Sequence, residues 1–579
     1  MNTTANTSDT SDTSGTGNTL DSFSKSAGRQ LLVYALMSIA GVAALMVTLS
    51  WASSLTGGAS AGSQLGVDPE LNMITLTLRE EPPQLNSTLQ TDQVSGMVIA
   101  HLIEGLLRYD HNNQLAPGVA ERWESTGMDA TFWLRDNALW SDGVPVTAHD
   151  FVFAWRTAVD PANASEYAFI LFPLENAEEI NKGEMPVEAL GVTAIDDRTL
   201  KVRLARPTAY FEKLMAFSTF FPIREDFYNQ TNGRYGADAH ELLYNGPFIL
   251  SRWVHGANLR MEKNPYYWNP DRIKLDVIEF PYITSDQNAL VNLFTDKKIA
   301  YTTLGAESLE TALEKRWHLE RFMDGSVFYI EFNFRSHRLT HNYHLRKAMQ
   351  LAIDPAELVY KVTKIPGYVP AESIFPLWLR GVDDFFRQEY PAQKITPDLE
   401  AAKKHLEIAK RELGISEIPP LVMLTGDNPV SNIQSEYYQG AFKKNLGLDI
   451  KIDKQIFKQR LAKMTSGDFD MVLAGWGPDY DDPLTFGDLF ASWNLNNRGR
   501  YNNPELDRQV YIAQNEIDPR TRMEAFAEIQ RIIIEDVVVL LSYERGLVYV
   551  TDPRLKGIVR RQAGADPDFT NAYIVDAAN

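Results

Sequence analysis

Strand-like and helix-like segments alternate along this chain from about residue 73 to residue 550, without a short-period repeat. Alternating apolar residues predict strands at 73–78, 131–135, 200–204, 327–332, 421–424, 449–452, 469–473, within 537–550, and from the N-G-P turn at 245–247 to 253. Apolar residues three or four apart predict helices at 94–107, 147–158, 343–353, 397–413, 430–446, 455–464 and 520–534, and one to 294 that Ser285 caps. Repeated strand–helix units indicate a mixed α/β architecture with ligand groups at the C-terminal ends of strands.

The length and composition restrict the class of protein. A chain of 579 residues exceeds a single ordinary core, so we expect two or three packed units. A formal net charge of -20 argues against nucleic-acid binding and favours cationic ligands. The absence of cysteine excludes disulfides, thiolate metal sites and a cysteine nucleophile. No metal-binding histidine pattern, phosphate-binding loop or nucleophile elbow is present, so we expect no cofactor, no metal and no enzymatic activity.

The N-terminal segment predicts a membrane anchor. Residues 1–30 form a polar tract that we expect to be a disordered cytoplasmic tail, and 31–52 contain an uncharged apolar stretch long enough to cross a bilayer. Lys25 and Arg29 precede it and no charge follows until Asp68, so the positive-inside rule places the large domain in the periplasm, held by a single pass through the inner membrane. A signal peptide cleaved near 59–61 is the alternative. Residues 53–67 read as a flexible tether.

The most informative local motif is A-G-W-G-P-D-Y-D-D-P at 474–483, which directly follows the apolar run 469–473. A strand that ends there places Asp479 in a rigid turn beside the indole of Trp476, because Pro478 restricts the backbone. A carboxylate next to an aromatic face suits a primary ammonium group, since charge-assisted hydrogen bonding and cation–π attraction act together. The alternative for Asp479 is a simple helix cap.

Seven motifs occur in the order typical of one protein family. They are L-I-E-G-L-L at 102–107, L-A-P-G-V-A-E-R-W at 115–123, W-S-D-G-V-P-V-T-A-H-D-F at 140–151, A-I-D-D-R-T-L at 194–200, N-G-P-F at 245–248, K-N-P-Y-Y-W at 263–268 and L-R-K-A at 345–348. From about residue 71 to 574 the chain resembles the oligopeptide and dipeptide class of solute-binding proteins that supply ABC importers, the bacterial extracellular solute-binding protein family 5. By itself, W-S-D-G reads as a structural Asp-Gly turn.

The resemblance implies an α/β fold of the two-lobed periplasmic binding protein type, class II, type C, with an extra subdomain. The implied division is lobe I at 68–103, 222–325 and 543–579, the inserted subdomain at 104–221, and lobe II at 326–542. It further implies a monomer that captures short peptides by closure of hinged lobes and delivers them to the permease subunits of an ABC importer.

The resemblance also implies the ligand-binding residues. Asp479 corresponds to the carboxylate for the peptide α-ammonium, and Trp476 to the aromatic lining the first side-chain pocket. Tyr167 resembles a subdomain tyrosine that touches the peptide, and Phe457 another pocket aromatic. Tyr329 and Gly475 lie where the peptide main chain would pair with the protein backbone.

The chain departs from the family pattern in the cations expected for a peptide carboxylate. Two positions that are commonly cationic in oligopeptide-type members hold Leu473 and Met464 here. Nearby alternatives are Lys463, Arg460, Arg498 and Arg500, so peptide length and terminal recognition stay open.

Two other functions stay open from the sequence. One is a membrane-tethered sensor or interaction protein on the same fold, and the other is an extracytoplasmic hydrolase. Asp481 and Asp482 are candidates to pair with a ligand or metal, although we expect them to cap a helix near 484–490.

Overall fold

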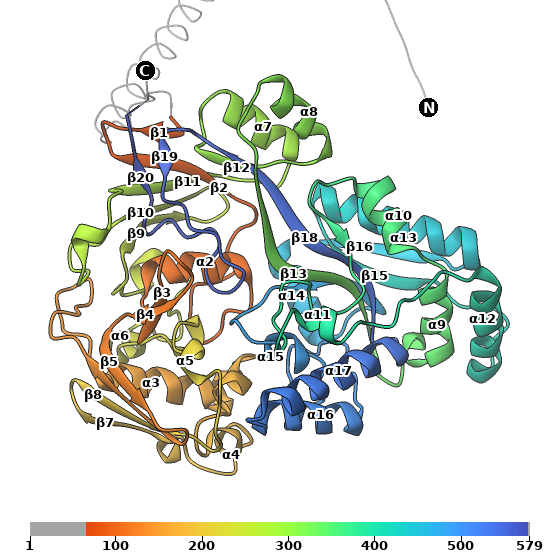
Figure 1. Cartoon of the computed structure of the whole chain (residues 1–579), viewed down its shortest axis with the longest axis horizontal. Helices are drawn as coiled ribbons and strands as arrows, with labels where there is room; N and C mark the ends of the chain where they lie inside the picture. The colour runs from red at the N-terminus through yellow and green to blue at the C-terminus, as the bar shows by residue number, and fades with distance from the viewer. Residues whose placement is uncertain (1–64, 577–579) are drawn as a thin grey trace, which may run out of the picture. The chain divides into compact units, whose positions relative to one another are not determined.

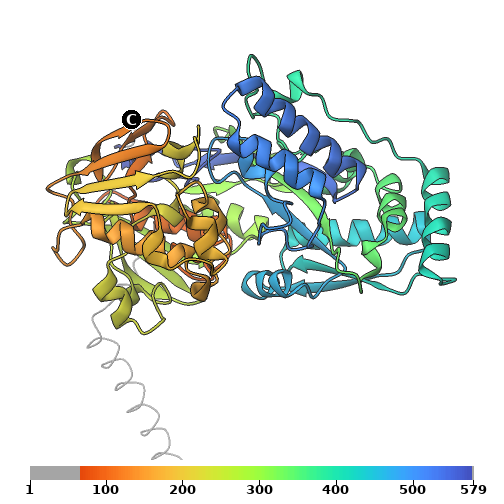
Figure 2. The same cartoon turned by 90° about the horizontal axis from the view of Figure 1, so that it is seen from below.

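A computed structural model describes residues 65–576 of the chain. The predicted cytoplasmic tail, the predicted membrane segment and most of the predicted tether lie outside these residues. Within the described residues, no helix has both the length and the apolar character that a bilayer crossing requires. The described residues form two lobes, which Figure 1 shows side by side and Figure 2 shows from a second direction.

The first lobe contains a five-stranded sheet in the order β1-β2-β11-β10-β9. Its strands are β1 (Val67–Asp68), β2 (Met73–Leu78), β9 (Phe248–Val254), β10 (Asn258–Lys263) and β11 (Val277–Ile283). β2 and β11 are parallel, and the other pairs are antiparallel. The helix α2 (Gln93–Leu102) packs on β9. The strand predicted at 73–78 is confirmed.

The helix predicted at 94–107 is shorter than its apolar spacing indicates. α2 ends at Leu102 because Ile103 has an extended backbone, and Leu107 begins the strand β3 (Leu107–Tyr109), which pairs with β4 (Leu115–Pro117). Gly105 lies so close to Met215 that a Cβ on it would stand 2.6 Å from the Met215 carbonyl oxygen. This tertiary contact overrides the helical pattern.

A four-stranded antiparallel sheet adds a second layer to the first lobe. Its order is β5 (Ala120–Ser125), β6 (Asp129–Leu134), β8 (Thr199–Arg203) and β7 (Val192–Asp196), and α3 (Ala148–Val159) packs against it. The buried Trp140 indole donates to Asp150 at 3.0 Å, and the Gly143 N–H donates to the Trp140 carbonyl at 2.8 Å. The W-S-D-G motif is therefore a structural turn, as predicted. Short helices in the same region are α4 (Ala177–Asn181), α5 (Phe211–Leu214) and α6 (Glu225–Gln230).

The second lobe is built on the largest sheet, in the order β12-β18-β13-β17-β15-β16, with β14 paired to β18. Its strands are β12 (Tyr301–Thr303), β13 (Glu320–Phe332), β14 (Val369–Pro370), β15 (Leu421–Gly426), β16 (Ile450–Gln455), β17 (Met471–Trp476) and β18 (Val539–Thr551). The strand predicted at 469–473 is found, but with shifted ends. It starts two residues later and includes Gly475 and Trp476, because β13 pairs with β17 as far as Val327 opposite Trp476.

Within the described residues, the second lobe also contains nine α-helices. They are α9 (Tyr343–Leu351), α10 (Pro355–Glu357), α11 (Phe386–Glu389), α12 (Leu399–Leu413), α13 (Pro429–Leu446), α14 (Phe457–Ser466), α15 (Leu484–Gly487), α16 (Pro504–Asn515) and α17 (Pro519–Glu535). Of these, α13 and α14 contact β15 and β16, and α10 contacts β14 and β18. Near β12 lie α7 (Gln287–Thr295) and α8 (Ala306–Glu314). The cap predicted at Ser285 is wrong, because the Asp286 carboxylate accepts the Ala289 N–H at 2.8 Å.

Two long strands, β13 and β18, connect the lobes. Each has 13 residues, and they pair antiparallel along most of their length (Figure 1). Their register shifts between Met323 and Val327, where Gly325 has a φ of 82°. At this irregularity Arg545 of β18 pairs with the buried Asp324 and donates to Gln93 at 3.0 Å. The chain thus crosses between lobes in a paired ladder.

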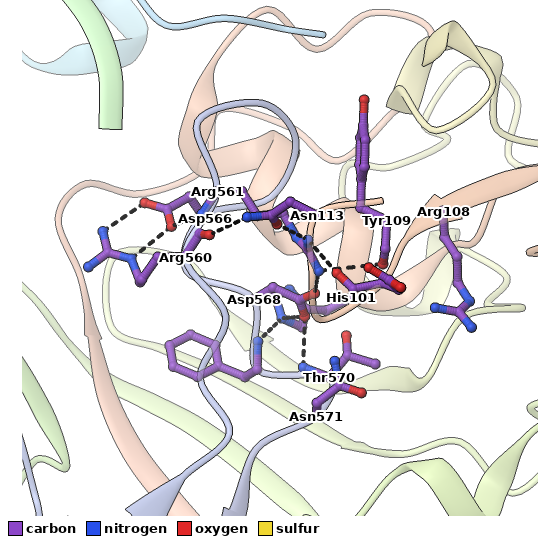
Figure 3. A network of polar contacts seen from close by, with 12 residues as sticks. His101, Arg108, Tyr109, Asn113, Arg560, Arg561, Asp566, Asp568, Thr570 and Asn571 are labelled. Atoms are coloured by element: carbon purple, nitrogen blue, oxygen red, sulfur yellow. Dashed lines mark hydrogen bonds and ion pairs between the residues drawn. The ribbon is translucent and has the colours of Figure 1, made fainter. Parts of the chain in front are cut away.

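The C-terminal segment returns to the first lobe and is fixed there by a buried polar network (Figure 3). The Arg561 guanidinium donates to Asp568 at 2.6 Å, and the His101 ring accepts the Phe569 N–H at 2.9 Å. Burial alone would raise the pKa of Asp568, but Arg561 and His101 lower it to about 2. Arg560 pairs separately with Asp566 at 2.8 Å. These contacts attach residues 560–570 to α2 and to the β3–β4 hairpin.

Candidate ligand-binding site between the lobes

The carboxylate of Asp479 lies in the turn that follows β17. Its backbone N–H donates to Thr485 Oγ1 at 2.9 Å, and the Tyr167 hydroxyl donates to both of its oxygens at 3.1 and 3.2 Å. Among residues 65–576, Asp479 forms no ion pair with lysine, arginine or histidine. Burial raises the pKa of this carboxyl to about 8, although part of its surface stays accessible. The structure therefore positions a desolvated carboxyl group and gives it no cation.

An aromatic wall stands beside this carboxyl group. The Trp476 indole stacks on Tyr167, with ring centroids 6.2 Å apart and an interplanar angle of 17°. Tyr167 also stacks on Phe169 at 5.7 Å. Trp476 Nε1 is buried and has no hydrogen-bond partner among the described residues. A small cation next to Asp479 would face both a carboxylate and an indole, as the motif predicts.

Contacts across the cleft hold the two lobes together. Tyr167 belongs to the first lobe and Asp479 to the second, so their hydrogen bond links the two lobes. In the same way, Glu166 pairs with Arg498 at 2.6 Å and accepts the Thr465 hydroxyl at 2.8 Å. The lobes are thus closed over the site.

The acidic residues after Asp479 have other partners than a metal. Asp481 contacts Lys213 of the first lobe at 3.3 Å, so it takes part in the closed arrangement rather than in capping α15. Asp482 accepts the Leu484 N–H at 3.0 Å and is also paired with the buried Arg522. Asp482 thus satisfies one N–H of the first turn of α15, but the N-cap position is occupied by Pro483, so the predicted side-chain cap is not found.

A cavity of about 340 Å³ lies between the lobes beside Glu166, and its wall does not include Asp479, Trp476 or Tyr167. First-lobe residues on its wall include Gln84, Thr91, Asp92 and Glu166, and second-lobe residues include Lys458, Leu461, Thr465 and Arg498. The second set belongs largely to α14. A space bounded by both lobes, with charged and apolar groups on its wall, has the character of a ligand site.

The other predicted site residues occupy different positions in the second lobe. Gly475 is exposed, and a Cβ on it would stand 2.5 Å from the Phe328 ring, so only glycine fits without displacing that ring. Tyr329 is buried against Phe490, and β13 has strand neighbours on both sides at this residue. Phe457 begins α14, with the Arg460 guanidinium 5.3 Å from its ring.

β17 has a free edge where the site begins. β15 pairs with β17 only at Val472 and the residue before it, so beyond this point β17 has β13 on one side and no strand on the other within the described residues. Main-chain groups up to Trp476 are therefore available for an added strand. Sequence reasoning placed Gly475 here but had no signal for this edge, because strand order is a tertiary property.

Packing explains the apolar residues at the two positions where the family commonly has cations. Leu473 is 6% exposed and Met464 is 9% exposed, and both lie in apolar clusters. Among the alternative cations, Lys463 is paired with Asp453 at 2.6 Å, Arg498 is paired with Glu166, and Arg500 is exposed. Of these four cations, Arg460 remains, and its Nε is buried with no hydrogen-bond partner within residues 65–576. Sequence reasoning missed Glu166, although it adjoins Tyr167, and Thr485.

Comparison with known proteins agrees with this arrangement. A model of the bacterial extracellular solute-binding proteins, family 5, matches residues 114–497. The chain belongs to this family. The oligopeptide-binding protein OppA of Bacillus subtilis is 32% identical over 516 residues, which cover 86% of this chain and 92% of OppA. This membership gives the chain the two-lobed α/β fold. It also places the chain among solute-binding receptors, a family that does not consist of enzymes.

Solved structures of relatives differ in how closely they superpose on this chain. OppA of Listeria monocytogenes bound to peptide is 31% identical and superposes with a TM-score of 0.82, covering 87% of this chain and 99% of that protein. The Escherichia coli murein tripeptide binding protein MppA, 26% identical, gives 0.80 over 87% of this chain and 99% of MppA. The unliganded open form of MppA, with 88% and 99% covered, gives only 0.59. The lobes here thus differ in arrangement from that open form.

Proposed function

We propose that this chain is an extracytoplasmic receptor that captures short peptides between its lobes and delivers them to an ABC importer without chemical conversion. The observation that carries the proposal is the Asp479 carboxyl group, which Tyr167 holds beside the Trp476 indole and which has no cation partner among the described residues. A peptide α-ammonium supplies the missing charge. Two relatives support the same ligand class, because one is named an oligopeptide-binding protein and the other was solved bound to peptide.

The free edge of β17 supports a peptide over another cationic solute. A ligand whose ammonium group contacts Asp479 would lay its main chain along the edge that ends at Gly475 and Trp476. Backbone pairing gives affinity without reading side chains. In this pose Tyr167 covers the ligand from the first lobe, Tyr329 supports the site from the neighbouring strand, and Phe457 borders the far end of the cleft.

Closure is the event that an importer would detect. We place the lobe boundaries at the irregularity of β13 and β18, with lobe I at 68–103, 222–325 and 543–579, an inserted subdomain at 104–221, and lobe II at 326–542. The four-stranded sheet within 120–203 supports the subdomain. Ligand contacts from both lobes favour the closed form, because a ligand shifts a conformational equilibrium by its differential affinity.

Calorimetry with the full-length chain tests the ligand class. Tripeptides with a free amino terminus should bind at least about tenfold more tightly than their N-acetyl forms, since acetylation removes the charge that Asp479 receives. Equal affinities would reject the ammonium site. Unchanged peptide uptake by cells lacking the protein would reject delivery to an importer.

We also propose that the receptor is a monomer. The apolar segment at 31–52 supports its attachment to the inner membrane by one pass, with the large domain in the periplasm. The intact mass of protein recovered from membranes tests this. A mass that includes residues 1–51 is expected, and a chain beginning near residue 62 would instead indicate cleavage.

A further inference from the structure

A second cavity, of about 70 Å³, lies within the first lobe. Its wall includes the end of α2 with β3, Pro247 and Arg272, and several of residues 561–570 in the C-terminal segment. Pockets for drug-sized ligands hold about 300 Å³ or more, whereas one water molecule needs about 10–15 Å³. The cavity therefore has room for a small ion and not for a peptide.

The wall of this cavity carries more positive than negative charge. Its charged residues are three arginines and two carboxylates: Arg108, Arg272, Arg561, Glu104 and Asp568. Arg561 pairs with Asp568 at 2.6 Å, and the pKa of Asp568 is about 2, so these two charges balance each other. Figure 3 shows this pair, with the Arg108 guanidinium apart from it. The other two arginines therefore share one carboxylate, that of Glu104.

Neutral donors already occupy that carboxylate. The Tyr267 hydroxyl donates to Glu104 Oε2 at 2.6 Å, and Trp268 Nε1 donates to Glu104 Oε1 at 2.5 Å. Arg108 Nε comes only within 3.8 Å of Glu104 Oε2, which is too far for a hydrogen bond. Arg108 Nε is buried and has no hydrogen-bond partner among residues 65–576. Because buried charged donors are usually satisfied, Arg108 points to an acceptor that these residues do not supply.

Arg272 lacks a counter-ion as well. Its Nε donates to Asn571 Oδ1 at 2.9 Å, and it forms no ion pair within the described part of the chain. Asn571 Nδ2, on the same amide, is buried and has no hydrogen-bond partner there either. Burial, reinforced by Arg272 and opposed by Glu104, lowers the pKa of Arg108. The two arginines thus repel each other, and an anion between them would offset this repulsion.

We propose that this cavity binds one small inorganic anion, of the size of chloride or phosphate, between Arg108 and Arg272. The two guanidinium groups supply charge-assisted hydrogen bonds, and the amide of Asn571, which follows Thr570 on the wall, supplies a further donor. The bound ion joins β3 to the segment around Arg272 and to the C-terminal segment. The proposal goes beyond peptide binding and does not depend on it, because the wall lies within the first lobe.

Titration of the full-length chain with anions tests the site. Sodium phosphate and sodium chloride are added separately at constant ionic strength, which the larger gluconate anion maintains. Calorimetry should give one bound ion per chain for at least one of them. At a hundredfold excess over the measured Kd, that ion should raise the melting temperature by about 2 °C or more, because it binds the folded form. If neither ion binds, the proposal is overturned.

Arg108→Gln separates an anion site from a structural ion pair. In gluconate alone this variant should melt no lower than wild type, because it removes a charge that Arg272 repels, and the rise with added anion should be lost. A lower melting temperature with the rise retained would show a structural Arg108–Glu104 pair and overturn the proposal. Arg203→Gln is the matched control, because Arg203 is exposed on β8 and contacts Glu175 at 3.5 Å. It should keep the wild-type response.

Asn571→Asp tests the site in the opposite direction, because it places a fixed carboxylate beside Arg272. This variant should melt at a higher temperature than wild type in gluconate and bind the added anion at least about tenfold more weakly. An unchanged anion affinity in both Asn571→Asp and Arg108→Gln would place the ion elsewhere and overturn the assignment. Peptide affinity should stay the same in both variants, so failure of the anion site leaves the peptide proposal standing.

Discussion

Replacing Asp479 by asparagine removes the charge of the proposed ammonium site and little else. An asparagine oxygen is able to accept the Tyr167 hydroxyl, and the contact to Thr485 comes from the backbone N–H, so the turn should keep its form. Breaking a buried charge pair costs about 2–5 kcal/mol. Ionising a carboxyl of pKa about 8 at pH 7 costs wild type about 1.4 kcal/mol, which the variant avoids. The net loss is about 1–3 kcal/mol, or about five- to 150-fold in Kd.

The assay is calorimetry with free-amine and N-acetyl peptides on both proteins. The loss should appear only with the free amine, and it should shrink as the pH falls from about 7.5 to 6, because protonated Asp479 no longer attracts an ammonium group. Asp468→Asn, an exposed carboxylate elsewhere in the second lobe, is the control and should have no effect. The same loss with both peptides, or a loss that grows at lower pH, would refute the reasoning.

Three further outcomes are expected. Gly475→Ala should weaken both peptide binding and folding, the latter by about 1–3 kcal/mol in denaturant titration, because its Cβ would displace the Phe328 ring; an unchanged midpoint contradicts this. Glu166→Gln removes the ion pair to Arg498 that links the lobes, so it should raise the peptide Kd about three- to tenfold. The radius of gyration measured by small-angle scattering should increase, and identical scattering of both proteins would contradict the prediction. Asp568→Asn should destabilise the protein by about 2 kcal/mol at pH 7. The difference should vanish as the pH falls through about 4 to 2, because the pKa of Asp568 is lower in the folded than in the unfolded protein. A pH-independent difference in melting temperature would contradict this.

Asp479 carries the opposite sign of linkage. Its folded-state pKa is above the ordinary value, so ionisation of this group opposes folding as the pH rises from about 4 to 8. The ligand-free Asp479→Asn protein should therefore melt at a higher temperature than wild type at pH 7. In the ligand-free protein, Asp479 lowers the free energy of unfolding. This is consistent with a group positioned for a ligand rather than for the core.

Local sequence signals predicted most elements and the central motif, because strand alternation and turn chemistry act over a few residues. The turn at Trp140 and the carboxylate beside Trp476 are such cases. The errors come from tertiary contacts. α2 ends early because Gly105 meets the backbone of Met215, and β17 extends to Trp476 because β13 supplies its partner. Neither neighbour is visible in the local pattern.

The unpartnered cation shows the same limit in the site itself. Arg460 was one of several nearby charges, and the sequence offered no reason to prefer it until Lys463 and Arg498 were found to be paired. A residue's availability for a ligand depends on which neighbours satisfy it, and this is decided by folding.

We propose that the hinge lies at the irregularity of β13 and β18, where it would couple peptide binding to lobe closure. Val327 pairs with Trp476 on one side and with Glu544 on the other, and the register of β13 and β18 shifts immediately before it. β17, which carries Trp476, is therefore paired with β13 at Val327, directly after the irregularity between the lobes. A ligand strand added to the free edge of β17 would restrain that ladder from the opposite side. We therefore expect peptide binding and lobe closure to act on the same few residues of β13, β17 and β18.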